Sequence, residues 1–208
     1  MISRVKREIL HHIFWYQQKK HHKYSFIHIN KCGGTSIEAA LALPKTHDTA
    51  YFRREKLGNE TWSKLITFAV VRHPYSRILS DYNFRVKTNQ NNLQTKKVTF
   101  DEWIKKTIID RDHFYYDKPK HFSSCWQWVT DLDRKSVIVD HIYKLEEIDD
   151  HWHDLCFRIG LSHVGLLPHE NKTEESKIED AITFMSEESR YAIRTHFCED
   201  FDNFNYEG

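Results

Sequence analysis

The sequence predicts an α/β fold in which helices cover both faces of a central parallel sheet, giving three layers. Segments with strand character alternate with helical segments along the chain, the pattern of parallel α/β sheets. One of those strands, residues 65–71, is apolar almost throughout, as expected of a parallel strand buried on both faces. The 208 residues, 39% of them hydrophobic, are enough for one domain with a substantial core. We therefore expect a single domain spanning residues 1–208.

The first strand–turn–helix unit lies near the start of the chain. Residues 24–29 are rich in β-branched and aromatic side chains, which predicts a strand. A glycine-containing turn follows at 30–36, and the apolar, alanine-rich residues 37–43 predict a helix that Pro44 ends. Ligands of parallel sheets bind at the carboxyl ends of strands, so this turn is a candidate site.

A second unit begins with the strand at 65–71. Arg72 follows it directly, and Pro74 suits the first turn of a helix that runs through Tyr82. The remaining elements are expected to be a loop at 89–92, a helix at 100–109, a loop at 113–120, a third strand at 136–145, and helices from about 174 to the end.

Residues 1–23 are basic and rich in histidine, and we expect them to form a peripheral helix or arm. The apolar stretch at 9–16 is too short and too polar to span a bilayer. It also lacks a small-residue cleavage site, so it does not read as a signal peptide. We expect a cytoplasmic protein without a transmembrane segment.

Charge and cysteine content exclude several classes of protein. Lysine and arginine number 31 and acidic residues 30, which gives no reason to expect a nucleic-acid partner. The four cysteines form no CxxC pair, so neither a zinc ribbon nor a thioredoxin motif is present. The histidine pairs at 11–12 and 21–22 and the His-Trp-His run at 151–153 lack further placed ligands. We expect no metal site, and any anionic ligand must be held by local cations.

The turn at 30–36 has the chemistry of an anion site. Glycines allow the backbone to approach a ligand closely, and the start of the following helix favours a phosphate or sulfate. The residues that contribute are Lys31, Gly33, Gly34, Thr35 and Ser36. In the Walker pattern GxxxxGK[ST] the lysine follows the glycines, whereas here it precedes them. The turn is therefore a poor match to an ordinary P-loop NTPase.

A second anion site is expected at the end of the second strand. Arg72 directly follows that strand, and Ser80 stands eight residues later, about two helical turns along. An arginine fork with a hydroxyl makes a good clamp for a phosphate monoester. A helix-capping arginine and a surface serine would explain this turn alone, but they explain less well why two anion sites stand on adjacent strand-to-helix turns.

These segments resemble the PAPS-dependent sulfotransferase superfamily, especially its carbohydrate sulfotransferase branch. Residues 26–36 resemble the family's 5′-phosphosulfate loop, and residues 68–82 resemble its 3′-phosphate segment. Shorter matches stand at 143–146, 167–173 and 200–206, so that the resemblance covers nearly the whole chain.

The resemblance implies a P-loop-like sulfotransferase fold. It also implies transfer of a sulfuryl group from 3′-phosphoadenosine-5′-phosphosulfate (PAPS) to a hydroxyl, with 3′-phosphoadenosine-5′-phosphate (PAP) as product and a carbohydrate as acceptor. Lys31 and the backbone of Cys32, Gly33, Gly34, Thr35 and Ser36 would hold the 5′-phosphosulfate, with the Cys32 thiol taking no part. Arg72 and Ser80 would hold the 3′-phosphate, and the loop around Lys172 is a candidate for closing over the nucleotide.

The reaction expected from this resemblance places Lys31 where it can stabilise charge on the departing nucleotide. A hydroxyl nucleophile also benefits from a general base. His47 is the first candidate, because the family often takes its base from the segment after the first helix. The lesser candidates are Glu38, His28 and His121, although Glu38 can equally be an ordinary helix carboxylate and His28 a strand residue facing the core.

The residues of the acceptor site are less well defined by the sequence. Trp126, Gln127 and Trp128 could line an acceptor groove, or the tryptophans could belong to the core. Glu146 could order the nucleotide loop or simply end a strand. Two other functions stay open: a P-loop-type small-molecule kinase, which would need ATP and magnesium, and a non-catalytic module that binds PAPS or another nucleotide.

Overall fold

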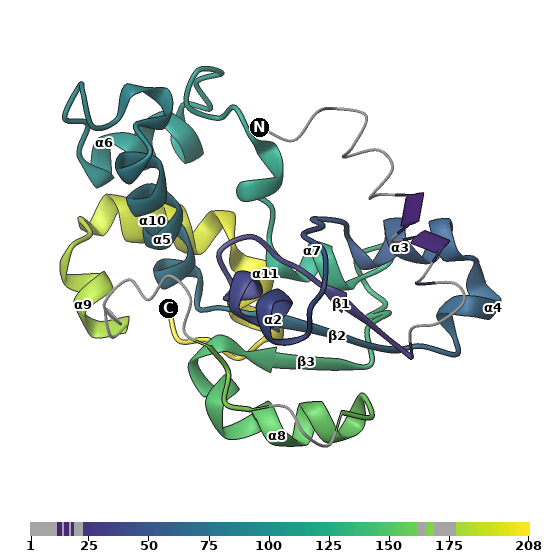
Figure 1. Ribbon diagram of the computed structural model, residues 1–208. Helices are drawn as coiled ribbons and strands as arrows, with labels where there is room; N and C mark the ends of the chain where they lie inside the picture. Colours follow the sequence, from purple (N-terminus) through teal and green to yellow (C-terminus); the bar gives the residue numbers. More distant parts are fainter. Residues whose placement is uncertain (1–11, 14, 17, 19–22, 162–164, 169–177) are drawn as a thin grey trace. The chain divides into compact units, whose positions relative to one another are not determined.

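The computed structural model describes the chain except for residues 1–11, 14, 17, 19–22, 162–164 and 169–177 (Figure 1). Most of the expected N-terminal arm and the loop around Lys172 lie outside the described residues. The chain divides into two compact units, a first unit of residues 1–29, 33–70 and 128–168 and a second unit of residues 30–32, 71–127 and 169–208. The expected single domain stays a prediction.

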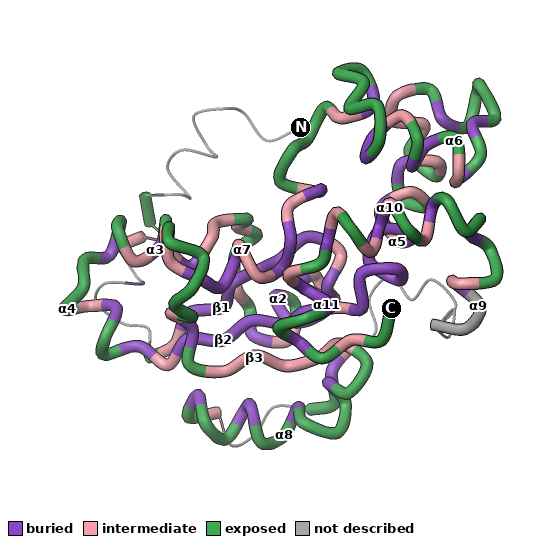
Figure 2. Tube along the Cα trace, turned by 180° about the vertical axis from the view of Figure 1, so that it is seen from behind, coloured by how far each residue is buried: buried purple, intermediate pink, exposed green. Residues whose placement is uncertain are grey.

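Among the described residues, the sheet has three strands in the order β1-β2-β3: β1 Tyr24–Ile27, β2 Ile66–Val71 and β3 His141–Lys144. β1 and β2 run parallel, with Phe26 opposite Phe68. Figure 2 shows β1 and β2 as buried and β3 as partly exposed. The predicted parallel α/β sheet is confirmed.

The third strand is shorter than the predicted 136–145. Val137 instead makes an isolated antiparallel bridge with Thr130. At Asp140 the side chain takes the place of a backbone partner, because its Oδ2 accepts from both the amide and the hydroxyl of Thr67, each at 2.7 Å. The strand therefore begins only at His141.

Helices cover both faces of the sheet in the first unit. On one face, Phe26, Phe68 and Val70 pack against α2 (Gly34–Ala40) and α8 (Ile148–Arg158). On the other face lies α3 (Ala50–Leu57), whose buried Arg53 donates a hydrogen bond to Ser25 of β1 at 2.9 Å. The short helix α4 (Asn59–Trp62) follows α3, and α7 (Cys125–Val129) crosses the boundary between the two units in the sequence.

The second unit is helical and has an aromatic core. Its longest helix, α5 (Pro74–Lys87), begins at the predicted proline. The other helices are α6 (Phe100–Ile104), which continues as a π-helical turn at Lys105–Ile109, and α9 (Ile178–Thr183), α10 (Glu187–His196) and α11 (Cys198–Asn203). The fully buried aromatic side chains are Trp103, Phe122, Phe197 and Phe201.

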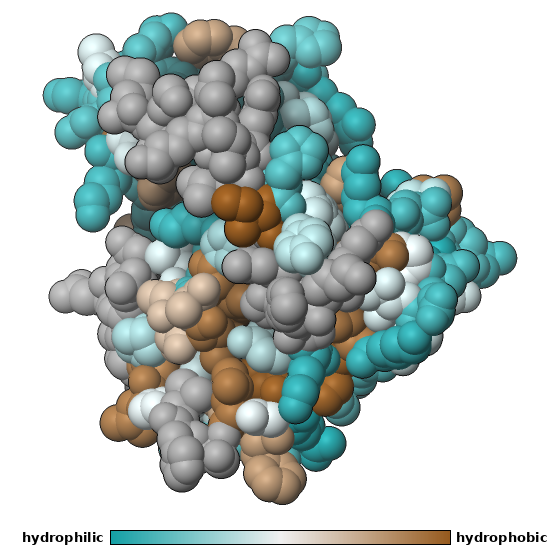
Figure 3. Space-filling model, turned by 45° about the vertical axis from the view of Figure 1, so that its right-hand side comes forward, coloured by the Kyte–Doolittle hydropathy of each residue, from teal (hydrophilic) through white to brown (hydrophobic). Residues whose placement is uncertain are grey.

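Large hydrophobic side chains that stay exposed are scattered along the chain. In the first unit they include Leu132, Phe157 and Leu166, and in the second unit Phe184 and Tyr191. Figure 3 shows one face of the molecule, on which hydrophobic residues stand among hydrophilic ones. Single exposed hydrophobic residues of this kind are normal on protein surfaces.

A buried cation organises the second unit. Arg85 has a fully buried side chain, and its Nε donates to Asp81 Oδ2 at 2.9 Å. Its Nη1 donates to Asp117 Oδ1 at 2.7 Å and to Asn91 Oδ1 at 2.9 Å. Burial alone would raise the pKa of Asp81, but the hydrogen bonds from His121 and Arg85 outweigh it, so the pKa is lowered. The Asp81 carboxylate is thus kept charged beside the arginine.

We predict that Arg85→Met destabilises the protein by about 3–5 kcal/mol, because it leaves the buried Asp81 without its cation. Urea denaturation measures the change. Arg158→Ala is the matched control, since Arg158 and Asp154 form a pair of the same i,i+4 spacing on the surface of α8. Its unfolding midpoint should barely move. Equal midpoints for the two variants would show that burial gives the Asp81–Arg85 pair no special weight.

Candidate functional site

The turn between β1 and α2 requires glycine for two separate reasons. Gly33 has φ +73°, in the left-handed region, and a Cβ there would lie 2.5 Å from Leu145 Cδ1. Gly34 has no room either, because a Cβ on it would lie 2.2 Å from His28 Nε2. The neighbouring Lys31 is also left-handed, with φ +67°. The turn is therefore a tight backbone cradle that no larger residue at these two glycines would reproduce.

This cradle leads into the start of α2. Gly33 is the N-cap residue and supplies no side-chain hydrogen bond to the helix. The amide of Ser36 donates to the Gly33 carbonyl at 3.1 Å, which closes the first turn. The positive end of a helix start favours a bound anion. Thr35 is half-buried and Ser36 is buried, and both hydroxyls stand in this first turn.

Lys31 and Arg72 lie together in the second unit. Arg72 Nη1 donates to the Lys31 carbonyl at 3.4 Å. Lys31 Nζ stands 4.3 Å from the centre of the Phe84 ring on α5. Burial lowers the pKa of Lys31, the Asp81 carboxylate opposes that change, and the Arg72 charge adds to it. The structure thus places the guanidinium of Arg72 against the backbone of Lys31, the other cationic residue predicted to bind the cofactor.

Arg72 is placed by the junction of β2 and α5. The next residue, His73, caps α5, with its Nδ1 accepting from the Tyr75 amide at 3.3 Å. That assignment puts the proton of His73 on Nε2, which lies 3.0 Å from the Glu207 carbonyl. Ser80, the predicted partner of Arg72, is half-buried in α5 of the same unit.

Arg77 fixes the backbone just before Lys31, a role that the sequence reading did not foresee. It is buried, and its Nε donates to the Asn30 carbonyl at 3.2 Å while its Nη1 donates to the Ser123 carbonyl at 2.9 Å. Asp200 lies 3.7 Å from Arg77 Nη1 and accepts from the first two amides of α7. The only sequence signal was an arginine on the helix that follows β2.

Cys32 is buried, and its Sγ lies 3.9 Å from Cys125 Sγ. Both are free thiols. The thiol therefore packs against Cys125, and the backbone of Cys32 remains its contribution to the turn.

Three of the four candidate bases lie together in the first unit. His47 is exposed, its Nδ1 lies 3.3 Å from the His28 carbonyl, and the two imidazole rings are 4.2 Å apart at their centres. His28 Nδ1 in turn lies 2.7 Å from Glu38 Oε1. Glu38, which the sequence also allowed as an ordinary helix carboxylate, is only 3% exposed. The fourth candidate, His121, belongs to the second unit, where its Nδ1 lies 2.8 Å from Asp81 Oδ1.

The expected acceptor residues differ in their surroundings. Trp128 is 1% exposed and belongs to the core. Trp126 and Gln127, in the second unit, are half-buried, and Gln127 Nε2 donates to Glu199 at 3.3 Å. Glu146 is exposed in a 3-10 turn at Leu145–Glu147, directly after β3.

The described part of the chain offers neither a metal site nor a membrane span. Within it, no group of three or more His, Cys, Asp or Glu residues could hold a metal ion. No helix within it is long and apolar enough to cross a membrane. The expected cytoplasmic location stays a prediction.

Comparison with known proteins identifies the family. The model of the Sulfotransferase family matches residues 15–207. Neither the curated proteins nor the solved structures contain a match to the chain. The family match covers nearly the whole chain, including Gly33, Gly34, Lys31 and Arg72. The protein therefore belongs to the sulfotransferase family.

Proposed function

We propose that this sulfotransferase moves a sulfuryl group from PAPS to a hydroxyl of a carbohydrate. The observation that carries the proposal is the contact of Lys31 with Arg72, on the turns that follow β1 and β2, in a chain of this family. The family supports sulfuryl transfer. The choice of PAPS as donor and of a carbohydrate as acceptor is our inference.

The residues present fit the two ends of PAPS. Neither Gly33 nor Gly34 carries a side chain, so the backbone of this turn can approach a phosphosulfate group closely. Lys31 adds a full positive charge next to that backbone. Arg72 offers a fork of donors for the 3′-phosphate, and Ser80 offers a hydroxyl.

In the proposed reaction, an acceptor hydroxyl oxygen forms a bond to sulfur while the bond from sulfur to the phosphate oxygen breaks. Lys31 stabilises the negative charge that builds on that departing oxygen, and this stabilisation is stronger in the transition state than before it. His47 accepts the hydroxyl proton as general base. The products are the sulfated acceptor, PAP and a proton.

A transfer assay with radiolabelled PAPS against glycans, lipids and small phenols tests the proposal. We expect label on a glycan. Label on a phenol or lipid alone would contradict the carbohydrate acceptor. Phosphorylation that depends on ATP and magnesium would point to a kinase, and PAP binding without transfer to any acceptor would point to a non-catalytic binding module.

We predict that Arg72→Ala weakens PAP binding by roughly 10-fold to 100-fold, because a bound phosphate loses a charged partner worth about 1.5–3 kcal/mol. Calorimetry measures the affinity. Arg111→Ala, which removes an exposed arginine of the same unit, is the control and should bind PAP like the wild type. If AMP binds to the wild type as tightly as PAP does, Arg72 and Ser80 do not hold a 3′-phosphate.

We predict that Lys31→Ala lowers turnover far more than it weakens PAP binding. PAP lacks the sulfuryl group, and the lysine acts mainly on charge that develops during transfer. Initial rates and calorimetry on the same variant give the two quantities. Equal losses in both would mean that Lys31 only binds the nucleotide.

The pH dependence of the same step provides a control with Lys31→Arg. Burial lowers the pKa of Lys31, so its charge is lost as pH rises at a lower pH than for an ordinary lysine. The kcat/KM for PAPS should therefore fall on the alkaline side in the wild type. Arginine stays charged in this range, so Lys31→Arg should move that fall to higher pH. An unmoved alkaline limb would assign it to another group.

We predict that His47→Ala slows transfer by roughly 10²-fold or more while PAP binding stays intact. A histidine base must be neutral, so wild-type activity should rise with pH through the range in which histidines titrate, near pH ~6.5, and the variant should lack this rise. His153→Ala, at an exposed histidine of α8 in the same unit, is the control. A His47→Ala enzyme with normal turnover and an unchanged pH profile would place the base elsewhere.

A further inference from the structure

The exposed His47 rests on a buried histidine. Its ring lies 4.2 Å from the ring of His28 at an angle of 53°. Its Nδ1 lies 3.3 Å from the His28 carbonyl oxygen. Because a carbonyl can only accept, this contact requires the hydrogen on Nδ1. In the neutral ring the basic nitrogen of His47 is then Nε2.

The position of His28 suits it to support His47, and the enclosed ring cannot act as the base itself. It is 5% exposed, and its ring fills the space where a Cβ of Gly34 would stand. The Nδ1 atom of His28 lies 2.7 Å from Glu38 Oε1. An acceptor hydroxyl cannot approach a ring enclosed in this way, so the role left to His28 is that of a platform for His47.

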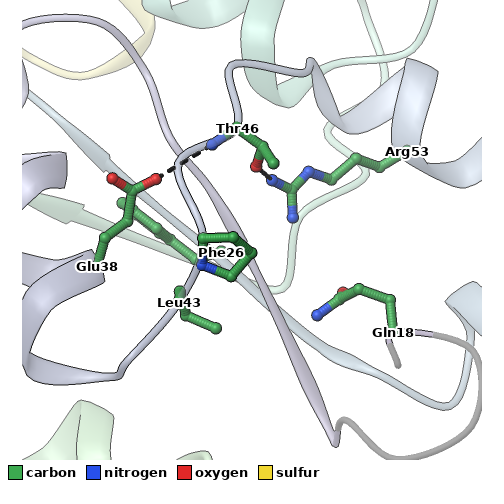
Figure 4. A pocket seen from close by; sticks show the side chains of 7 residues that line it. Gln18, Phe26, Glu38, Leu43, Thr46 and Arg53 are labelled. Atoms are coloured by element: carbon green, nitrogen blue, oxygen red, sulfur yellow. Dashed lines mark hydrogen bonds between the residues drawn. The ribbon is translucent and has the colours of Figure 1, made fainter. Parts of the chain in front are cut away.

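One oxygen of Glu38 joins this platform to the backbone before His47. Glu38 Oε1 contacts His28 Nδ1 and also accepts from the Thr46 amide at 3.3 Å. Figure 4 shows the carboxylate directed toward Thr46 from α2. The hydroxyl of Thr46 is bound from the other side by Arg53 of α3. The residue before His47 is therefore held between α2 and α3.

The charges around this segment belong to the same unit. Burial lowers the pKa of Arg53 to about 10, while the nearby carboxylates Asp48 and Glu38 act in the opposite direction. Arg53 is also bound to Ser25 of β1 at 2.9 Å, so it is fixed independently of Thr46. The Glu38 carboxylate therefore has two partners that are themselves held in place. One is the buried His28 ring, and the other is the backbone of Thr46, whose hydroxyl is bound by Arg53.

We infer that Glu38 is a positioning residue for the base: its Oε1 holds the His28 ring and the Thr46 amide in place, and these two hold His47 with Nε2 as its basic nitrogen. The inference rests on the role proposed above for His47. It assigns to Glu38 no contact with substrate. The proposed role depends on the length of the Glu38 side chain, which brings one oxygen to both donors. His28 Nδ1 and the Thr46 amide both bind that one atom, Oε1.

Two variants of Glu38 distinguish the effect of its side-chain length from the effect of its charge. Glu38→Gln keeps an oxygen at the same distance from the backbone but removes the charge. Glu38→Asp keeps the charge but is one methylene shorter, so that it cannot serve both partners. Asp131→Asn is the matched control, since Asp131 is a carboxylate of the same unit, paired with Arg54 at 2.8 Å and remote in sequence from this segment.

The experiment measures the tautomer of His47 by nitrogen NMR of labelled protein, together with kcat and the KM for PAPS. We expect Glu38→Gln and Asp131→Asn to keep the hydrogen of His47 on Nδ1 and to retain most of kcat. Glu38→Asp should release the ring into both tautomers and lower kcat by roughly 10-fold to 100-fold, because a small misplacement of a reacting group has a large effect on rate. The KM for PAPS should stay within about twofold in each variant.

The inference fails if Glu38→Asp shows the wild-type tautomer and rate, or if Glu38→Gln loses as much as Glu38→Asp, since the carboxylate would then act through its charge. The NMR readout does not depend on turnover. If the wild type transfers no sulfuryl group, the proposed function fails, while the tautomer comparison still decides whether Glu38 positions His47.

Discussion

The close packing of His28 and Leu145 against the turn after β1 is the constraint on which the first unit depends. The His28 ring occupies the space where a Cβ of Gly34 would stand, and Gly33, beside Leu145, has a left-handed backbone that disfavours any side chain, so the turn favours glycine at both positions. The same His28 ring then presents Nδ1 to Glu38 and its face to His47. A substitution in the cradle would thus disturb both the proposed anion site and the support of the proposed base.

The second unit holds several cationic side chains, which repel one another. Arg77 and Arg85 are buried in α5 and find their partners among carbonyls and carboxylates of the same unit. Arg77 fixes Asn30, and Lys31 follows directly in the chain. Lys31 and Arg72 are left near the surface, where a bound anion can reach them and offset their repulsion.

The sequence predicted what depends on local pattern. The apolar run of β2 and the proline that starts α5 identified these elements. Residue type and position made Lys31 and Arg72 candidate ligands of an anion, which stays a prediction. The helix α8 was missed because charged residues interrupt its apolar positions, although Ile148, Trp152 and Leu155 recur at helical spacing and are all buried. The start of β3 depends on a side chain that replaces a backbone bond at Asp140. The partnership of Glu38 with residues ten positions before it and eight after it arises only from packing, so no spacing rule could reveal it.

A carboxylate paired with a histidine Nδ1 occurs in both units, and the difference between the pairs favours one of them as support for a base. Asp81 binds His121 and also the fully buried Arg85. Because Arg85 balances the charge of the Asp81 carboxylate, this cluster stabilises the fold of the second unit. Glu38 binds His28 and a neutral backbone amide, so its partners are the parts that carry His47. The geometry of a histidine–carboxylate pair is therefore not sufficient to identify catalytic machinery. What the carboxylate holds besides the histidine indicates whether the pair stabilises the fold or orients a reactive group.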